Sequence, residues 1–248
     1  MSTQQQKQFK ILLIGDNCTD VYQFGTVDRI SPEAPVPIFN FSHEEHRPGM
    51  AGNVLQNLRA LGCDVQFLYG EISTKCRLIE TRSKQHILRI DNDVASEPIE
   101  IVGEFPKVYD AVVISDYNKG TVSYELVEDL RSRFNGPIFI DTKKTDLARL
   151  EGCFVKINSL ENSLAKTFPT ELIVTMGGHG AKYKDKIYPC PSVNITDVCG
   201  AGDTFLAALT YKYLNTKSIS SAIEFANIAS AVTVQHSGVY APTLEEIQ

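Results

Sequence analysis

Short, continuous apolar runs recur along this chain and are separated by stretches with helical spacing. Such runs cover residues 9–14, 111–115, 137–141, 154–157 and 172–175. An uninterrupted apolar run of this length predicts a strand that is buried on both faces. Strands of this kind that alternate with helices are typical of a parallel sheet covered on both sides. The pattern therefore predicts an α/β fold.

Helical spacing is clearest in residues 51–61, where the apolar side chains include Val54, Leu55 and Leu58 and where Gly62 supplies a stop signal. Further helices are expected over residues 123–134, 201–214 and 218–236. Gly15 and Asp16 are expected to end the first strand.

Two other segments alternate between polar and apolar residues, as half-exposed strands do. They are residues 36–41 and the hairpin 76–90, which turns at residues 82–85. We expect them to form a small separate sheet, a lid that spans about residues 34–46 and 74–92. No linker or repeat interrupts the pattern, so residues 1–248 are predicted to form a single domain.

Composition narrows the classes of function. The chain has 248 residues and a net charge of −6, which argues against a general nucleic-acid binder. The apolar runs are too short to cross a bilayer, so no membrane association is expected. The six cysteines form no C-x-x-C pair, and no signal peptide is recognisable, which favours a reducing cytoplasm.

The richest chemical motif is the glycine-rich segment 196–205. Gly200, Ala201 and Gly202 lead into an apolar helix, and the free N–H groups of a helix start attract phosphate. Asp203 is placed to take a proton from a hydroxyl group beside it. Together these features indicate phosphoryl transfer to an alcohol, although a helix with an acidic first turn gives the same pattern.

Several polar residues follow the predicted strands, and ligands of parallel sheets bind beyond the carboxyl ends of the strands. These residues are Asp116, Asp141, Asn158 and Thr175. Asn158 and Glu161 either hold the water shell of Mg²⁺ or form a capping box at the start of a helix, and their spacing does not separate the two.

Other loops also have two interpretations. Asp20 could accept hydrogen bonds from sugar hydroxyls or cap a turn. The segment 47–53 is a second glycine-rich helix start, which either admits a ligand or simply joins loop and helix. The glycines of residues 177–180 could surround a nucleotide, although a hairpin turn is the simpler interpretation.

Taken in order, these segments resemble the ribokinase-like (pfkB) carbohydrate kinases. Residues 197–205 resemble the C-terminal signature of that family, and residues 49–53 its N-terminal one. Segments 29–37, 47–49 and 115–120 are most similar to the kinase domain of the heptose-7-phosphate kinase/adenylyltransferases. The resemblance implies a three-layer fold with a mainly parallel sheet, helices on both faces and a small β lid.

The resemblance also implies an ATP- and Mg²⁺-dependent sugar kinase, acting on the anomeric hydroxyl of a heptose 7-phosphate. Asp203 would be the base, with the N–H groups of Gly200, Ala201 and Gly202 facing the phosphoryl group. Residues implied on the sugar side are Asp20, Gly49 and Asn53, and we assign the strand-end carboxylate Asp116 to the same side. Those implied on the nucleotide side are Asn158, Glu161, Thr175, Gly177, Gly180 and Asn227, with Asn158 and Glu161 linked to Mg²⁺ through water. On charge grounds we assign Arg47 and Lys119 to the sugar phosphate.

The chain departs from the family pattern at Met50, Gly52, Cys199 and Thr142. It is also several dozen residues shorter, with one gap after Gly70 and another between Glu161 and Leu172, and it has no adenylyltransferase half. A kinase for another sugar or nucleoside, or a catalytically silent binding protein, are the alternatives. A homodimer formed through exposed lid strands is expected.

Overall fold

A ten-stranded sheet runs through the protein, and the structure, a computed structural model, describes residues 8–103 and 108–247 of it. The strands are β1 Lys10–Ile30, β2 Pro37–Met50, β3 Asp64–Glu80, β4 His86–Asn92, β5 Ala111–Asp116, β6 Ile138–Thr142, β7 Phe154–Asn158, β8 Leu172–Thr175, β9 Ala181–Tyr183 and β10 Lys186–Tyr188. The helices are α1 Ala51–Ala60, α2 Tyr124–Arg133, α3 Ser159–Leu164, α4 Ala201–Thr216 and α5 Ile219–Thr233, with short 3-10 helices η1 Leu147–Leu150 and η2 Gly177–His179. Every predicted strand and helix therefore has a counterpart.

The sheet is mainly parallel in its centre. Its strand order is β10-β9-β8-β7-β6-β5-β1-β3-β4, and β2 pairs with the other edge of the outer part of β1. The pairs β3–β1–β5–β6–β7–β8 are parallel, whereas β2, β4, β9 and β10 are added in antiparallel fashion. The carboxyl ends of β5, β6, β7 and β8 thus lie on one side, where ligands of such sheets bind.

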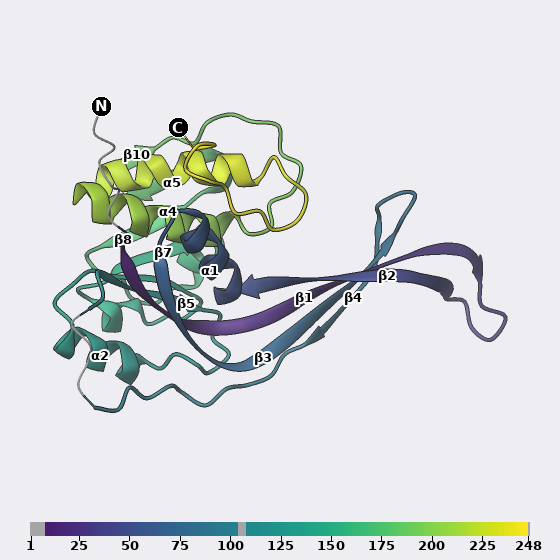
Figure 1. The fold of residues 1–248 in the computed structure, drawn as a ribbon, viewed down its shortest axis with the longest axis horizontal. Helices are drawn as coiled ribbons and strands as arrows, with labels where there is room; N and C mark the ends of the chain where they lie inside the picture. Colours follow the sequence, from purple (N-terminus) through teal and green to yellow (C-terminus); the bar gives the residue numbers. More distant parts are fainter. Residues whose placement is uncertain (1–7, 104–107, 248) are drawn as a thin grey trace.

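Successive side chains of the central strands pack alternately into two separate hydrophobic cores. Ile11 and Leu13 of β1 pack in the core that α1, α4 and α5 complete. Leu12 and Ile14 pack in the opposite core, against α2 and η1. Because both faces of the strand are covered, the sequence reads as a continuous apolar run. The predicted three-layer arrangement is present (Figure 1).

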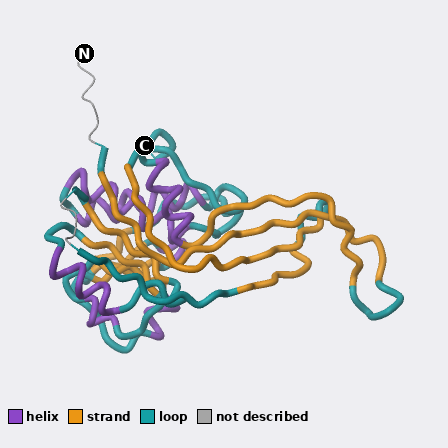
Figure 2. Tube along the Cα trace, turned by 60° about the horizontal axis from the view of Figure 1, so that its bottom comes forward, coloured by secondary structure: helices purple, strands orange, loops and turns teal. Residues whose placement is uncertain are grey.

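The lid is not a separate sheet, and this prediction was wrong. β1 does not end at Gly15–Asp16 but continues to Ile30, and β3 stays paired with it from Asp64 to Glu80. The lid, which we define as β2, β4 and the parts of β1 and β3 beyond Asp16 and Glu71, is therefore the far end of the central sheet. Figure 2 shows these strands extending away from the helices.

A β-bulge marks the junction of core and lid. The β1–β3 register runs from Gly15 opposite Tyr69 to Asn17 opposite Ile72, so that Asp16 faces two residues of β3. Bulges of this kind bend and twist a strand pair. The two residues of β3 that lie opposite Asp16 are Gly70 and Glu71, the position of the first gap expected from the sequence. Strand β3 runs unbroken through this position, from the core into the lid.

The helices agree with the predictions within a few residues at each end. Gly62 adopts a positive φ of 83° directly after α1, as expected of a helix stop. The helices within residues 8–103 and 108–247 are all too short or too polar to span a membrane.

Candidate active site

The start of helix α4 brings the glycine-rich motif and its carboxylate together. Gly200 caps the helix with a φ of 79°, a conformation that favours glycine. Asp203 lies in the first turn and is only 6% exposed. The first N–H groups of a helix have no acceptor within it. Ala201 N–H does donate to the Val198 carbonyl, but at a long 3.4 Å.

Two neutral side chains fix the Asp203 carboxylate. Asn53 Nδ2 donates to its Oδ2 at 2.7 Å, and the Tyr117 hydroxyl donates to its Oδ1 at 3.1 Å. Asn53 is in turn held by Asn57, whose amide also accepts a hydrogen bond from Thr204. Asn53, which was expected to contact a sugar, is therefore a partner of Asp203.

The loop that carries Tyr117 depends on Asp16. This carboxylate is 1% exposed and accepts hydrogen bonds from the backbone N–H groups of Tyr117, Lys119 and Thr121. Asp16 thus holds the loop after β5 and positions the Tyr117 side chain at the site.

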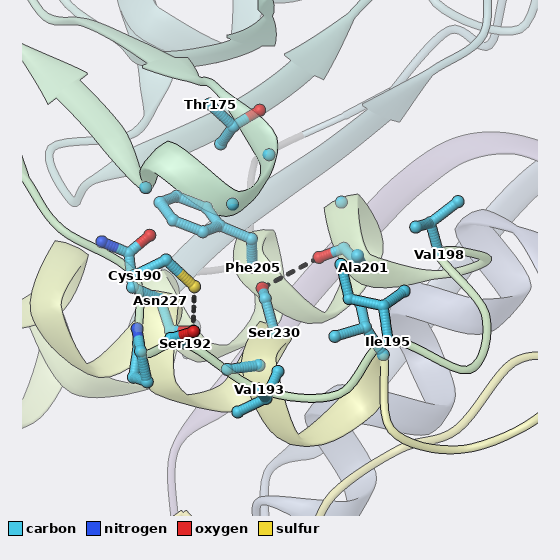
Figure 3. Close-up of a pocket in the computed structure, with 17 residues that line it drawn as sticks. Thr175, Cys190, Ser192, Val193, Ile195, Val198, Ala201, Phe205, Asn227 and Ser230 are labelled. Atoms are coloured by element: carbon cyan, nitrogen blue, oxygen red, sulfur yellow. Dashed lines mark hydrogen bonds between the residues drawn. The ribbon is translucent and has the colours of Figure 1, made fainter.

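Three pockets meet at the first turn of α4. The helix pocket lies between the turn after β8 and helices α4 and α5 (Figure 3). The residues predicted for the nucleotide that line it are Thr175, Gly177, Gly180 and Asn227. Its wall is largely apolar, with Val193, Ile195 and Phe205 among its members. Asn227 Nδ2 donates to the carbonyls of Tyr188 and Pro189, so this side chain supports the wall.

The central pocket holds the acidic residues at the strand ends. Its lining includes Asp116, Asp141, Asn158, Glu161 and Asp203, together with Gly200 and Gly202. Asn158 Oδ1 accepts from Glu161 N–H at 2.9 Å, and Glu161 Oε2 accepts from Asn158 N–H at 2.7 Å. The capping box is therefore formed, and it aims both side chains toward the pocket. Asp116, predicted for the sugar side, lies in this pocket.

Basic residues of the lid line the third, or lid, pocket. Arg77 Nη1 donates to Asp20 Oδ1 at 2.6 Å, and Lys75 and Arg89 lie in the same wall. Gly49 also lines it. A Cβ there would lie 2.4 Å from the Asp20 carboxylate, so the position favours glycine. Gly200, Tyr117 and Asp203 border both the lid and central pockets.

The two cations predicted for a sugar phosphate lie beside this pocket. Arg47 pairs with Glu45 at 2.8 Å and lies over the Tyr22 ring. Lys119 pairs with Asp93, which also binds Lys75 at 3.0 Å. Arg47 and Lys119 do not line the lid pocket. Its cationic lining residues are Lys75, Arg77 and Arg89.

Sequence reasoning missed Lys75, Arg77, Arg89, Tyr117 and Lys156. Two signals could have found some of them. Residues two apart in a strand share a face, so Lys75 and Arg77 of the predicted lid segment 74–92 had to point to one side. Lys156 interrupts an otherwise apolar strand, and a buried lysine requires a partner.

The chain is similar to known proteins over almost its whole length. Residues 122–247 match the pfkB family of carbohydrate kinases. The bifunctional protein HldE of a Nitratiruptor species is 33% identical over 299 residues, covering 96% of this chain. The chain belongs to the pfkB family of carbohydrate kinases. The aligned part of HldE is 64% of that relative's length.

Solved structures confirm the ribokinase-like fold of this pfkB kinase. Ribokinase from Thermotoga maritima superimposes with a TM-score of 0.72 at 16% identity, covering 96% of this chain and 98% of the other. Arabidopsis thaliana ribokinase, solved with ribose and ATP, gives a TM-score of 0.71 at 14% identity, covering 97% and 98%. The HldE alignment of 299 residues exceeds the 248 residues of this pfkB kinase, so the relative carries segments that are absent here.

Proposed function

We propose that this carbohydrate kinase transfers the γ-phosphoryl group of ATP to a hydroxyl group of a phosphorylated sugar. The observation that carries the proposal is the position of Asp203, which borders the central and lid pockets while its neighbours Ala201 and Gly202 border the helix pocket. ATP, the phosphoryl donor, bound in the helix pocket and the accepting hydroxyl group in the lid pocket would thus meet beside the Asp203 carboxylate.

The helix pocket suits the adenosine part of ATP. Its apolar wall between α4 and α5 offers stacking and burial to a base, and the glycines after β8 allow close backbone approach. The A. thaliana ribokinase, which shares the fold, was solved with ATP.

The lid pocket suits a sugar that already carries a phosphate. Three cations, Lys75, Arg77 and Arg89, line it, and guanidinium groups bind phosphate through paired hydrogen bonds. Asp20 in the same wall would accept hydrogen bonds from hydroxyl groups. The similarity to HldE and the motifs shared with heptose kinases make the anomeric hydroxyl of a heptose 7-phosphate the proposed acceptor.

In the proposed reaction Asp203 takes the proton of the acceptor hydroxyl as that oxygen bonds to the γ-phosphorus. The bond from the γ-phosphorus to the bridging oxygen breaks, and ADP leaves with the electron pair. The N–H groups at the start of α4 face the charge that develops on the phosphoryl oxygens.

The central pocket fits Mg²⁺ through its oxygen donors. Asn158 Oδ1 and Glu161 Oε2 each accept one hydrogen bond in the capping box, so Glu161 Oε1 and the second lone pair of Asn158 Oδ1 could accept hydrogen bonds from water bound to Mg²⁺. In the described residues, no three His, Cys, Asp or Glu side chains converge into a direct metal cage. Bound Mg²⁺, held largely by phosphates and water, supplies positive charge to the phosphates.

The test is ATP consumption with a panel of acceptors. Heptose 7-phosphate should give the highest kcat/KM, ahead of fructose 6-phosphate, ribose and a nucleoside. A preference for an unphosphorylated acceptor would contradict the sugar-phosphate assignment. Absence of turnover with every acceptor, combined with a Tm raised by ATP, would indicate a binding protein instead.

A pH profile tests the assigned base. Burial, followed by the negative charge of Asp141, raises the pKa of Asp203 to about 6 from an ordinary 3.8, against the opposing effects of Asn53, Lys156 and Tyr117. The base acts when deprotonated, so kcat/KM should fall about tenfold per pH unit below about 6. An acid limb centred near pH 4 would contradict the assignment of Asp203 as the buried base.

The lid also offers a surface for a second copy of the chain. Ile72, Leu88 and Ile90 are 46%, 53% and 52% exposed on the outer part of β3 and β4, and β2 and β4 leave free edges. We expect light scattering to give a dimeric mass that Ile90→Asp reduces to a monomeric one. The matched control is Ile187→Asp, at an exposed isoleucine of β10. A monomeric parent protein would refute the dimer.

A further inference from the structure

Lys156 is a buried cation in the middle of the central strand β7. It lies on β7 between Val155 and Ile157, which are fully buried, and is itself only 4% exposed. Burying an ammonium group is costly unless a partner compensates the charge. The residue nevertheless lines the central pocket, together with Asp203, Gly200 and Gly202.

Asp141, at the end of the neighbouring strand β6, holds the ammonium group. Its Oδ2 lies 2.7 Å from Lys156 Nζ. Burial lowers the pKa of Lys156, but the Asp141 carboxylate, together with Glu161 and Asp203, more than offsets this and the pKa ends above its ordinary value. The group is therefore a cation at neutral pH. An ammonium group has three N–H donors, and the bond to Asp141 uses one of them.

Gly202 places that ammonium group against the backbone of helix α4. A Cβ added to Gly202 would lie 2.9 Å from Lys156 Nζ, closer than side-chain atoms pack. The cation thus faces the first turn of the helix, where the N–H groups favour an anion. Two independent sources of positive potential therefore converge beside Asp203.

We infer that Lys156 is a catalytic residue whose ammonium group binds the γ-phosphoryl group during its transfer, and that Asp141 positions it. The inference rests on the proposed function. Lys156 forms no covalent bond: it donates hydrogen bonds to the phosphoryl oxygens while the bond to the bridging oxygen breaks and the bond to the acceptor oxygen forms. The ammonium group neutralises part of the negative charge on the phosphoryl oxygens, which the backbone N–H groups at the start of α4 would otherwise stabilise alone.

A merely structural role would make Lys156 a counter-ion of Asp141. That role does not require the ammonium group to lie against the start of α4. A buried ion pair can often be replaced by apolar residues without loss of stability, so a purely structural pair should tolerate its replacement. The two roles separate when both charges are removed together.

The test compares the binding of ATP and ADP by calorimetry, which requires no acceptor. Lys156→Met should weaken ATP binding by about tenfold, and that of ADP by no more than about twofold, because only ATP has the γ-phosphate. Turnover with the sugar phosphate should fall by about 10²–10³-fold, with its KM nearly unchanged.

The double variant Asp141→Asn/Lys156→Met removes both members of the ion pair. It should fold even if Lys156→Met does not, and it should show the same loss for ATP. Lys184→Met, at an exposed lysine paired with Glu171, is the matched control and should change neither affinity. Equal losses for ATP and ADP, or normal kcat in the double variant, would overturn the inference. Failure of the proposed function would instead be seen in the parent protein, as absence of ATP consumption.

Discussion

Asp203→Asn is expected to lower kcat by about 10²–10⁴-fold, the usual contribution of a general base. The amide oxygen can still accept the hydrogen bond from Asn53, which now reaches Asp203 Oδ2 at 2.7 Å. The amide cannot take a proton from the acceptor hydroxyl. The variant therefore keeps the shape of the site and loses one chemical step.

Affinity for ATP should be nearly unchanged in Asp203→Asn, because the helix pocket does not include the carboxylate. Rapid-quench kinetics with saturating sugar phosphate measure the transfer step directly. Asp185→Asn, in the exposed turn between β9 and β10, is the control and should behave like the parent. A variant that retained more than about one-tenth of the parental kcat would remove Asp203 from the role of base.

Arg77→Met is expected to raise KM for the sugar phosphate by about 10–100-fold, since hydrogen bonds to charged groups contribute about 1.5–3 kcal/mol. Arg77 is held in the lid pocket by Asp20, at 2.6 Å, and lies over the Tyr22 ring, 5.2 Å from its centre. KM for ATP should stay unchanged, because the helix pocket lies on the other side of Asp203.

Arg77→Met also leaves the Asp20 carboxylate without its partner, so Arg77→Lys is needed beside it. Lysine keeps the charge but not the planar fork of donors, and its KM should fall between those of the parent and the Met variant. Arg149→Met, at a surface arginine that pairs with Glu125 and Glu128, is the control. If KM for an unphosphorylated sugar rises by the same factor, Arg77 acts on Asp20 rather than on the phosphate.

Local patterns were sufficient to predict the elements of the core. The apolar runs of β5, β6 and β7 and the helical spacing of α1 depend on neighbours in the sequence, and the structure has each of them. The glycine-rich start of α4 was predictable for the same reason, since Gly200 needs a left-handed backbone and the helix follows at once.

Contacts between distant residues were not predictable in this way. Asn53 and Asp203 are 150 positions apart, and a helix start offers no sign of which side chain will reach it. The cations of the lid pocket come from two strands whose register is set only when β3 and β4 pair. The continuation of β1 from the core into the lid was also not predictable. Gly15 and Asp16 look like a strand end in the sequence, and only the pairing with β3 shows that the strand continues.

The unbroken course of β1 and β3 has a consequence for how a sugar enters and leaves. Asp20 and Arg77 lie on these two strands just beyond the bulge, so the groups proposed to grip the sugar are built into the same ribbons that anchor the core. If the proposed function holds, opening of the lid to release the product would bend the paired strands β1 and β3 near Gly15–Asn17, rather than rotate a separate sheet about a linker. The turnover of this enzyme would then depend on the stiffness of that short stretch.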